Sequence, residues 1–320
     1  MKILAPHIAN LFFYGNCQGI DESTLRRFLI DDQLDVCNSN NWVNDSEYLE
    51  VLSVLVNKVN NQYFGLYYGS YLNIKALGLI ADISLNASNL EQAVVLLQRY
   101  LDSTFPFVSL ILERNSEHFI LRLECIVEDK VLKNHILDIV LCFIYRELRI
   151  MLVEKYFPTI QLPYSNVDEY TKFLNTIIIK GNSHSLVLSN DVLGIEINKK
   201  RVKEIAILLP KFLIMLVKKN RDYKSFSLQV RNMILNMCSP ELPSFDQVSK
   251  QFPLSDRTIQ RKLTDEGQSF RKISDDIKRE LSYYLAKGKQ IKTQDIACIL
   301  GYSEPSAYLH AVKRWDAVSD

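Results

Sequence analysis

LSDRTIQRKLTDEGQSFRKISDDIKRELSYYLAKGKQIKTQDIACILGYSEPSAYLHAVKRW, residues 254–315, is the stretch that decides the fold of the last third of the chain. Near its start, Ser255 can cap a helix, because its hydroxyl accepts a hydrogen bond from a backbone N–H group that the first turn leaves free. Ile259 and Leu263 follow on one apolar face. Gly267 suits the left-handed residue that ends a helix. The sequence therefore predicts a helix that runs from Ser255 to just before Gly267.

A second, shorter helix is predicted immediately upstream. Ser244, with Gln247 three residues later, has the spacing of a capping box. One apolar stripe follows, formed by Phe245, Val248 and Phe252. Pro253 ends this helix, because proline cannot continue the backbone hydrogen bonds. Together the two helices, at about 244–266, have the plan of a helix-turn-helix.

The same plan recurs closer to the C-terminus, at about 293–315. Val248 corresponds to Ile296, 48 residues further on. One extra residue in the turn shifts the second helices to an offset of 49, at which Ile259 corresponds to Tyr308. The repeat predicts two helix-turn-helix units.

Residues 269–287 between the two units have the spacing of one continuous helix. Its apolar stripe consists of Phe270, Ile273, Ile277 and Leu281. At 1.5 Å per residue this helix is about 28 Å long. That length could hold two recognition helices about one DNA turn apart, roughly 34 Å.

The local charge is compatible with nucleic-acid binding. Residues 244–314 hold thirteen Lys and Arg residues against nine Asp and Glu residues, whereas the whole chain has a net charge of only +1. An excess of this size is also common on an ordinary solvated surface. The charge alone is therefore weak support.

The sequence before residue 220 predicts a domain that mixes helices and strands. Helical apolar spacing is found at Tyr48–Val59, Leu90–Leu101 and Val131–Tyr156. Short β-prone runs lie at Phe107–Leu112, His118–Ile126, Ile160–Pro163, Thr176–Ile179 and Leu186–Leu188. The first two of these runs predict a hairpin. The charged run KKNRDYK at 218–224 is the expected linker. The fold class is thus an α+β domain, 1–220, followed by an all-α double helix-turn-helix domain, 221–320.

Several classes of protein are excluded by the composition. With 48% hydrophobic and 23% charged residues the chain is an ordinary globular one. No apolar run reaches the roughly 20 residues of a membrane span, and no secretory signal is recognisable, so we expect a cytoplasmic protein without a membrane partner. The six cysteines and five histidines are scattered, and motifs of nucleophilic or phosphate-binding sites are missing. We expect no metal, no cofactor and no enzymatic activity.

The quoted stretch resembles the DNA-binding domain of AraC/XylS-type transcription regulators, across both helix-turn-helix units and the helix between them. Upstream, Phe64–Tyr100 and Glu169–Leu193 are similar to the arabinose-binding-like N-terminal domain of one branch of that family. The resemblance covers most of the chain. It implies a sequence-specific regulator whose partner is double-stranded DNA.

The resemblance assigns base reading to positions of the two recognition helices, which here are Arg257, Gln260 and Arg261 in the first and Ser306, Leu309 and His310 in the second. Arginine can bind guanine O6 and N7 as a fork, and glutamine can bind adenine in the same way. The family commonly has arginine at the position of His310, so the second unit is expected to contribute less to base reading. Candidates for phosphate contacts are Lys262, Arg271, Lys292, Lys313 and Arg314.

For the N-terminal half the resemblance implies an effector pocket, a dimerisation surface, or both, and hence a homodimer. Candidate pocket residues are Tyr67, Tyr68, Tyr71, Phe105 and Phe107, although aromatic residues in such positions are more often plain core. The family's usual Trp-x-Gly-x-Ser-Pro ending is replaced here by WDAVSD from Trp315 onward, so the final short helix is expected to be missing. These departures leave an alternative function open: an interaction or ligand-sensing protein that retains the fold with weakened operator recognition.

Overall fold

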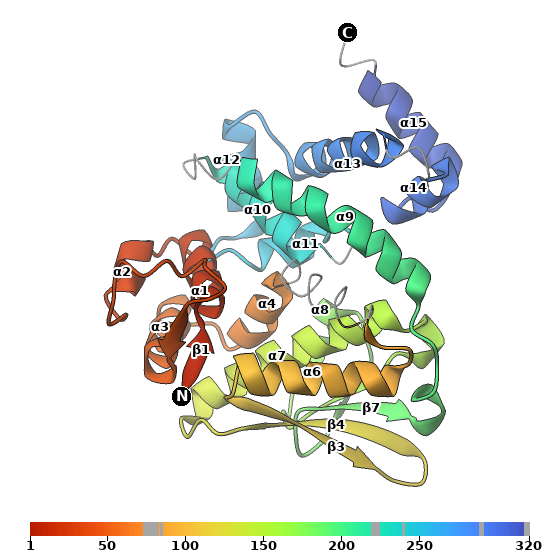
Figure 1. Ribbon diagram of the computed structural model, residues 1–320. Helices are drawn as coiled ribbons and strands as arrows, with labels where there is room; N and C mark the ends of the chain where they lie inside the picture. The colour runs from red at the N-terminus through yellow and green to blue at the C-terminus, as the bar shows by residue number, and fades with distance from the viewer. Residues whose placement is uncertain (73–82, 84–85, 219–224, 239–240, 288–290, 317–320) are drawn as a thin grey trace. The chain divides into compact units, whose positions relative to one another are not determined.

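The computed structural model describes residues 1–72, 83, 86–218, 225–238, 241–287 and 291–316 (Figure 1). The described residues fall into two compact units, the first ending at Lys199 and the second beginning at Lys200. None of the helices in the described ranges combines the length and apolar character that a membrane crossing requires. The expected linker falls almost entirely on residues 219–224, which lie outside the described residues.

The first unit is built on a five-stranded sheet in the order β3-β4-β7-β5-β6. Its strands are β3 (Val108–Arg114), β4 (His118–Cys125), β5 (Thr159–Leu162), β6 (Ile178–Lys180) and β7 (Ser185–Ser189). All neighbours are antiparallel except β5 and β6. The predicted hairpin is confirmed, with Val108 opposite Cys125. A separate two-stranded sheet pairs β1 (Lys2–Leu4) with β2 (Trp42–Asn44).

Helices α6 and α7 cover one face of this sheet (Figure 1). The helices of the unit are α1 (Ala5–Cys17), α2 (Glu22–Arg26), α3 (Asp45–Val59), α4 (Phe64–Tyr71), α6 (Leu90–Thr104), α7 (Lys130–Met151) and α8 (Asp168–Leu174). The described residues of the unit also contain two 3₁₀ turns, η1 (Glu154–Tyr156) and η2 (Asn190–Val192). Helices α3 and α6 lie where the apolar spacing predicted them.

Helix α4 packs very closely on α7, because glycines on α4 leave room for the backbone of α7. A Cβ atom at Gly65 would come 2.6 Å from the carbonyl oxygen of His135, and one at Gly69 would come 3.0 Å from the Cα atom of Ile139. Both distances are tighter than ordinary carbon contacts. The two glycines, one helical turn apart on α4, therefore set the distance between these helices.

The prediction of one helix from Val131 to Tyr156 is wrong at its C-terminal end. Helix α7 stops at Met151, and Leu152 has extended backbone angles, with ψ at 160°. The chain then makes the short turn η1 and leads into β5. The apolar pattern continues past Met151 because Leu152 is also buried in the core, although its backbone is extended and not helical.

All the regular secondary structure in the described residues of the second unit is helical. Its helices are α9 (Lys199–Lys218), α10 (Phe226–Met237), α11 (Phe245–Ser249), α12 (Asp256–Asp265), α13 (Phe270–Lys287), α14 (Thr293–Ile299) and α15 (Pro305–Asp316). The pairs α11–α12 and α14–α15 are two helix-turn-helix units, and α13 is the helix between them. The fold class is confirmed as α+β followed by all-α. Residues 317–320 of the altered ending lie outside the described residues.

Candidate nucleic-acid interface

Helix α12 is fixed at both ends by the residues that predicted it. The Oγ atom of Ser255 accepts a hydrogen bond from the backbone N–H of Thr258 at 3.3 Å. At the other end Gly267 has φ at +65°, and the N–H of Gln268 donates to the carbonyl of Leu263 at 2.8 Å. This is a left-handed helix termination, which glycine adopts without steric cost. The ends of α12 are therefore specified locally.

The two faces of α12 differ sharply. Ile259 and Leu263 are each only 1% exposed and anchor the helix in the core of the unit. Arg257, Gln260 and Arg261 are exposed on the opposite side. These three positions lie in the first six residues of α12, and the N-terminal part of a recognition helix is the part that meets base edges in the major groove. They are the positions to which the resemblance assigned base reading, and that role stays a prediction.

Helix α15 has the same arrangement with different chemistry. Its buried side consists of Tyr308, Ala311 and Trp315. Among its exposed residues, Ser306, Leu309, His310 and Lys313 have the i, i+3, i+4, i+7 spacing of one helix face. Ser306 and His310 thus lie on one surface, as the resemblance implied. Guanidinium groups are missing from these four side chains, which distinguishes this face from that of α12.

Helix α13 contacts both helix-turn-helix units. Phe270 at its start packs edge-on against Phe245 of α11, with ring centroids 5.4 Å apart. Further along, the Oγ atom of Ser282 lies 2.8 Å from the Oη atom of Tyr308 in α15. Both contacts are made by residues of the apolar or buried side of α13. One continuous helix thereby connects the two recognition helices.

The candidate phosphate-binding side chains are all exposed, but they are not equivalent. Lys262, Arg271, Lys292 and Lys313 extend from the surface, and the Lys262 ammonium also lies 5.4 Å from the ring centroid of Phe226. Arg314 forms an ion pair with Asp275 of α13 at 3.0 Å. A phosphate contact by Arg314 would have to compete with this carboxylate. The phosphate role of the five residues stays a prediction.

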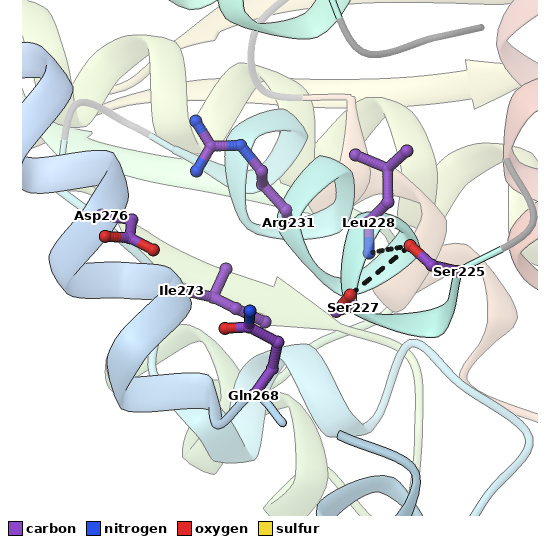
Figure 2. Close-up of a pocket in the computed structure, with 7 residues that line it drawn as sticks. All are labelled: Ser225, Ser227, Leu228, Arg231, Gln268, Ile273 and Asp276. Carbon is purple, nitrogen blue, oxygen red and sulfur yellow. Dashed lines mark hydrogen bonds between the residues drawn. The ribbon is translucent and has the colours of Figure 1, made fainter. Parts of the chain in front are cut away.

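A polar pocket of about 250 Å³ lies beside the N-terminal end of α10. Figure 2 shows its lining residues, which are Ser225, Ser227, Leu228, Arg231, Gln268, Ile273 and Asp276. The charged groups at this pocket already have partners within the protein. Arg231 pairs with Glu280 at 2.6 Å, and Asp276 pairs with Arg279 at 3.0 Å. The pocket therefore has no unbalanced charge to offer a ligand.

The five candidate effector residues of the first unit lie in the aromatic core. Tyr68 and Tyr71 on α4 stack with a centroid distance of 6.2 Å, and Tyr67 on the same helix donates from its hydroxyl to Glu169 at 2.8 Å. The pKa of the Tyr67 phenol is raised, mainly by burial and secondly by the hydrogen bond to Glu169. Phe105 and Phe107 form a separate edge-to-face pair with centroids 5.4 Å apart. All five are at most 6% exposed, and their pocket role stays a prediction.

A buried polar cluster in the first unit was not predicted from the sequence. Asp138 on α7 is 1% exposed, and its carboxylate accepts hydrogen bonds from the hydroxyls of Tyr170, at 2.7 Å, and Tyr164, at 3.1 Å. His184 lies 3.1 Å from the same carboxylate. Burial is the main cause that raises the pKa values of both tyrosines, and the charge of Asp138 raises them further. The available signal was an aspartate inside the apolar run HILDIVLC.

The N-terminal half matches the model of a known family. The N-terminal arabinose-binding domain of AraC transcription regulators matches residues 21–194, which is more than half of the chain. The chain belongs to the AraC family of transcription regulators. The helical bounds found for α11 to α15 agree with the resemblance of the C-terminal part to this family. No group of three or more His, Cys, Asp or Glu side chains in the described part of this AraC-type chain could hold a metal ion.

Individual proteins are also similar to this AraC-type chain, two of them over shorter parts of it. The HTH-type transcriptional regulator VqsM of Pseudomonas aeruginosa is 33% identical over 87 residues, 27% of either chain. The uncharacterized HTH-type transcriptional regulator Rv1395 of Mycobacterium tuberculosis is 29% identical over 104 residues, 32% of this chain and 30% of that one. The chain thus spans less than a third of the length of these relatives. The crystal structure of the transcriptional regulator CdpR from Pseudomonas aeruginosa has a TM-score of 0.44 at 17% identity, covering 97% of this chain and 95% of that one.

Proposed function

We propose that this chain is a sequence-specific regulator that binds double-stranded DNA and reads bases mainly through α12. The observation that carries the proposal is the exposed side of α12, where Arg257, Gln260 and Arg261 form one surface. Behind them, Ile259 and Leu263 are almost completely buried, so the position of the helix is set by the core and not by the exposed side chains.

The chemistry of these three side chains matches base edges in the major groove. Arg257 and Arg261 can each donate two parallel hydrogen bonds to guanine, and Gln260 can both donate to and accept from adenine. Cationic side chains elsewhere on the unit would contact phosphates and fix the register without reading sequence. This division separates the residues that determine specificity from those that determine general affinity.

The remaining parts of the proposal concern the first unit and the assembly. We propose that residues 1–220 sense a small-molecule effector and form a homodimer, and that residues 221–320 bind DNA. The match of residues 21–194 to an effector-binding domain of AraC regulators supports this division. A dimer would bind two half-sites with a higher effective concentration than two separate monomers.

A mobility-shift titration of the full chain tests DNA binding. The probe is the DNA upstream of the chain's own coding sequence, with an excess of unrelated duplex as competitor. A shift that survives the competitor, and that Arg257→Ala and Arg261→Ala together abolish, supports the proposal. A shift that the competitor removes entirely contradicts sequence-specific reading of this probe.

Sedimentation of the full chain at tens of micromolar tests the assembly. A monomer at these concentrations would require a dimer free energy weaker than about −6 kcal/mol, which would contradict the proposed homodimer. A dimer supports it. The same measurement in the presence of the specific duplex shows whether one or two chains occupy the site.

The face of α15 favours a second candidate function. It carries Ser306, Leu309 and His310 where α12 carries two arginines and a glutamine. The alternative is an interaction or ligand-sensing protein that keeps the fold but has weakened operator recognition. It predicts a shift that unrelated DNA removes, together with normal folding of the C-terminal unit.

A further inference from the structure

We propose that Leu309 determines specificity by contacting the C5-methyl group of a thymine in the major groove. The inference rests on the proposed DNA-binding function and deepens it, since it assigns a base chemistry to the second helix-turn-helix. The second unit would then read sequence by apolar contact, whereas the first reads it by hydrogen bonds.

The position of Leu309 in the fold supports this role. Leu309 is the fifth residue of α15, and Gln260 is the fifth residue of α12. The two positions are 49 residues apart, the same offset that relates the buried Ile259 to the buried Tyr308. Leu309 therefore occupies the place in the second unit that a base-reading glutamine is proposed to occupy in the first.

The exposure of Leu309 is unusual for its surroundings. Its side chain is 48% exposed and lies among the exposed polar residues Ser306, His310 and Lys313, with the exposed Pro305 one turn before it. The anchoring of α15 comes from the other side, where Tyr308 and Trp315 are each 5% exposed. Packing of the unit thus accounts for the buried side of α15 but leaves half of the Leu309 surface in water.

The major groove offers an apolar counterpart to such a side chain. Among the groups that base pairs present there, the nitrogen and oxygen atoms are hydrogen-bond donors or acceptors, and the C5-methyl of thymine is the apolar group. A leucine cannot satisfy donors or acceptors, so it would be unfavourable over guanine O6 or cytosine N4. Against a thymine methyl it buries apolar surface on both partners. The chemistry of Leu309 therefore selects thymine.

The polar neighbours are compatible with a T·A pair at the centre of this face. The Ser306 hydroxyl can donate or accept, and the His310 imidazole offers one donor in its neutral form. Lys313, one turn further along, can contact a phosphate at the edge of the groove. Such a face would prefer a T-containing half-site, in contrast to the guanine preference expected of Arg257 and Arg261.

The test removes the methyl group from the DNA and leaves the base pair unchanged. Duplexes that bind the full-length protein are first selected from a random pool. Each thymine of the selected consensus is then replaced by uracil, which lacks only the C5-methyl. Dissociation constants are measured by fluorescence anisotropy for the wild type, Leu309→Ala and Leu213→Ala. Leu213 lies on α9, is 43% exposed, and serves as the matched leucine control.

We expect that uracil at one or two positions of one half-site weakens wild-type binding. Each such replacement should weaken it about fourfold, because one apolar carbon is then no longer buried. In Leu309→Ala the same replacement should change the affinity by less than about 1.5-fold, because the methyl then has no apolar partner (a double-mutant cycle). The Leu213→Ala variant should keep the fourfold effect. A second variant, Leu309→Gln, should lose the methyl dependence as well, and circular dichroism of both variants should match the wild type.

The outcomes separate this inference from the proposed function. If selection enriches a consensus but uracil weakens wild type and Leu309→Ala equally, or weakens neither, then Leu309 reads no thymine methyl and the inference is overturned while specific DNA binding stands. If no consensus is enriched from the pool, sequence-specific binding itself fails, and the inference fails with it.

Discussion

The Oγ atom of Ser282 and the Oη atom of Tyr308 lie 2.8 Å apart in the interior of the C-terminal unit. Ser282 is on α13 and Tyr308 is on α15, so this hydrogen bond joins the helix that spans the domain to the second recognition helix. Both residues are buried, at 3% and 5% exposure. The orientation of the α15 surface, with Leu309 and His310, therefore depends on a polar contact as well as on apolar packing.

The first prediction is that Tyr308→Phe destabilises the C-terminal unit by about 1 kcal/mol, because it removes a hydrogen bond and leaves a buried serine hydroxyl. Unfolding is followed by the fluorescence of Trp315 on α15. Trp42, the other of the two tryptophans, is first replaced by phenylalanine so that Trp315 alone gives the signal. The matched control is Tyr283→Phe, which removes an exposed hydrogen bond to Asp316 and should cost less. Equal losses in the two variants would contradict the role given to the buried contact.

The second prediction concerns base reading by α12. Arg257→Ala and Arg261→Ala should each weaken binding to the selected duplex by about 1 to 3 kcal/mol and weaken binding to unrelated duplex less, because forked contacts to guanine discriminate between bases. Anisotropy titrations with both duplexes give the two affinities. Wild-type binding of the selected duplex by both variants would show that this face of α12 does not read bases.

A phosphate-contacting residue should behave differently, and Lys262→Ala is the matched comparison on the same helix. It should weaken selected and unrelated duplexes by similar factors. It should also reduce the slope of log affinity against log salt by about 1, since one fewer counterion is released. Loss of specificity in Lys262→Ala would place this lysine among the base-reading residues instead.

The third prediction is an asymmetry between the two units. His310→Ala should cost less specific affinity than Arg261→Ala, because a neutral imidazole makes at most one donor contact and a guanidinium makes two. His310→Arg should tighten binding at a half-site that offers guanine. Losses of the same size in His310→Ala and Arg261→Ala would show that α15 reads bases through the imidazole as strongly as α12 does through its arginine.

Local signals were sufficient to predict α11 to α15, whereas α9 and α10 were not predicted. The capping box of Ser244 and Gln247 is present, with the Oγ atom of Ser244 accepting from the N–H of Gln247 at 3.3 Å. Gly301, like Gly267, has a positive φ and ends a helix. Caps and terminal glycines act within a few residues, so the sequence displays them directly.

The first unit depends on contacts between distant residues, which a single sequence does not display. The parallel pairing of β5 with β6 and the insertion of β7 between β4 and β5 follow from the whole sheet. The cluster around Asp138 draws His184 from 46 residues away. The face of α12 could be predicted, because helical spacing alone places its side chains together. The Asp138 cluster could not, since its partners meet only through the tertiary fold.

The last prediction is that Glu147→Gln stabilises the first unit as the pH rises. Glu147 on α7 is fully buried, and burial, only partly offset by Arg146, raises the pKa of its carboxyl well above the usual value. The unfolded chain releases this proton near pH 4.3. Above that pH the folded state holds more protons than the unfolded state, so wild-type stability falls with rising pH until the folded pKa is passed. Glutamine keeps the shape and does not ionise, so the stability of the variant relative to wild type should rise between pH 4.5 and pH 8. Urea unfolding followed by circular dichroism at these two pH values measures the gain.

The exposed Glu50→Gln on α3 is the matched control, and its stability relative to wild type should change little between the two pH values. Parallel stability curves for Glu147→Gln and wild type would mean that the buried carboxyl has no raised pKa in the folded protein.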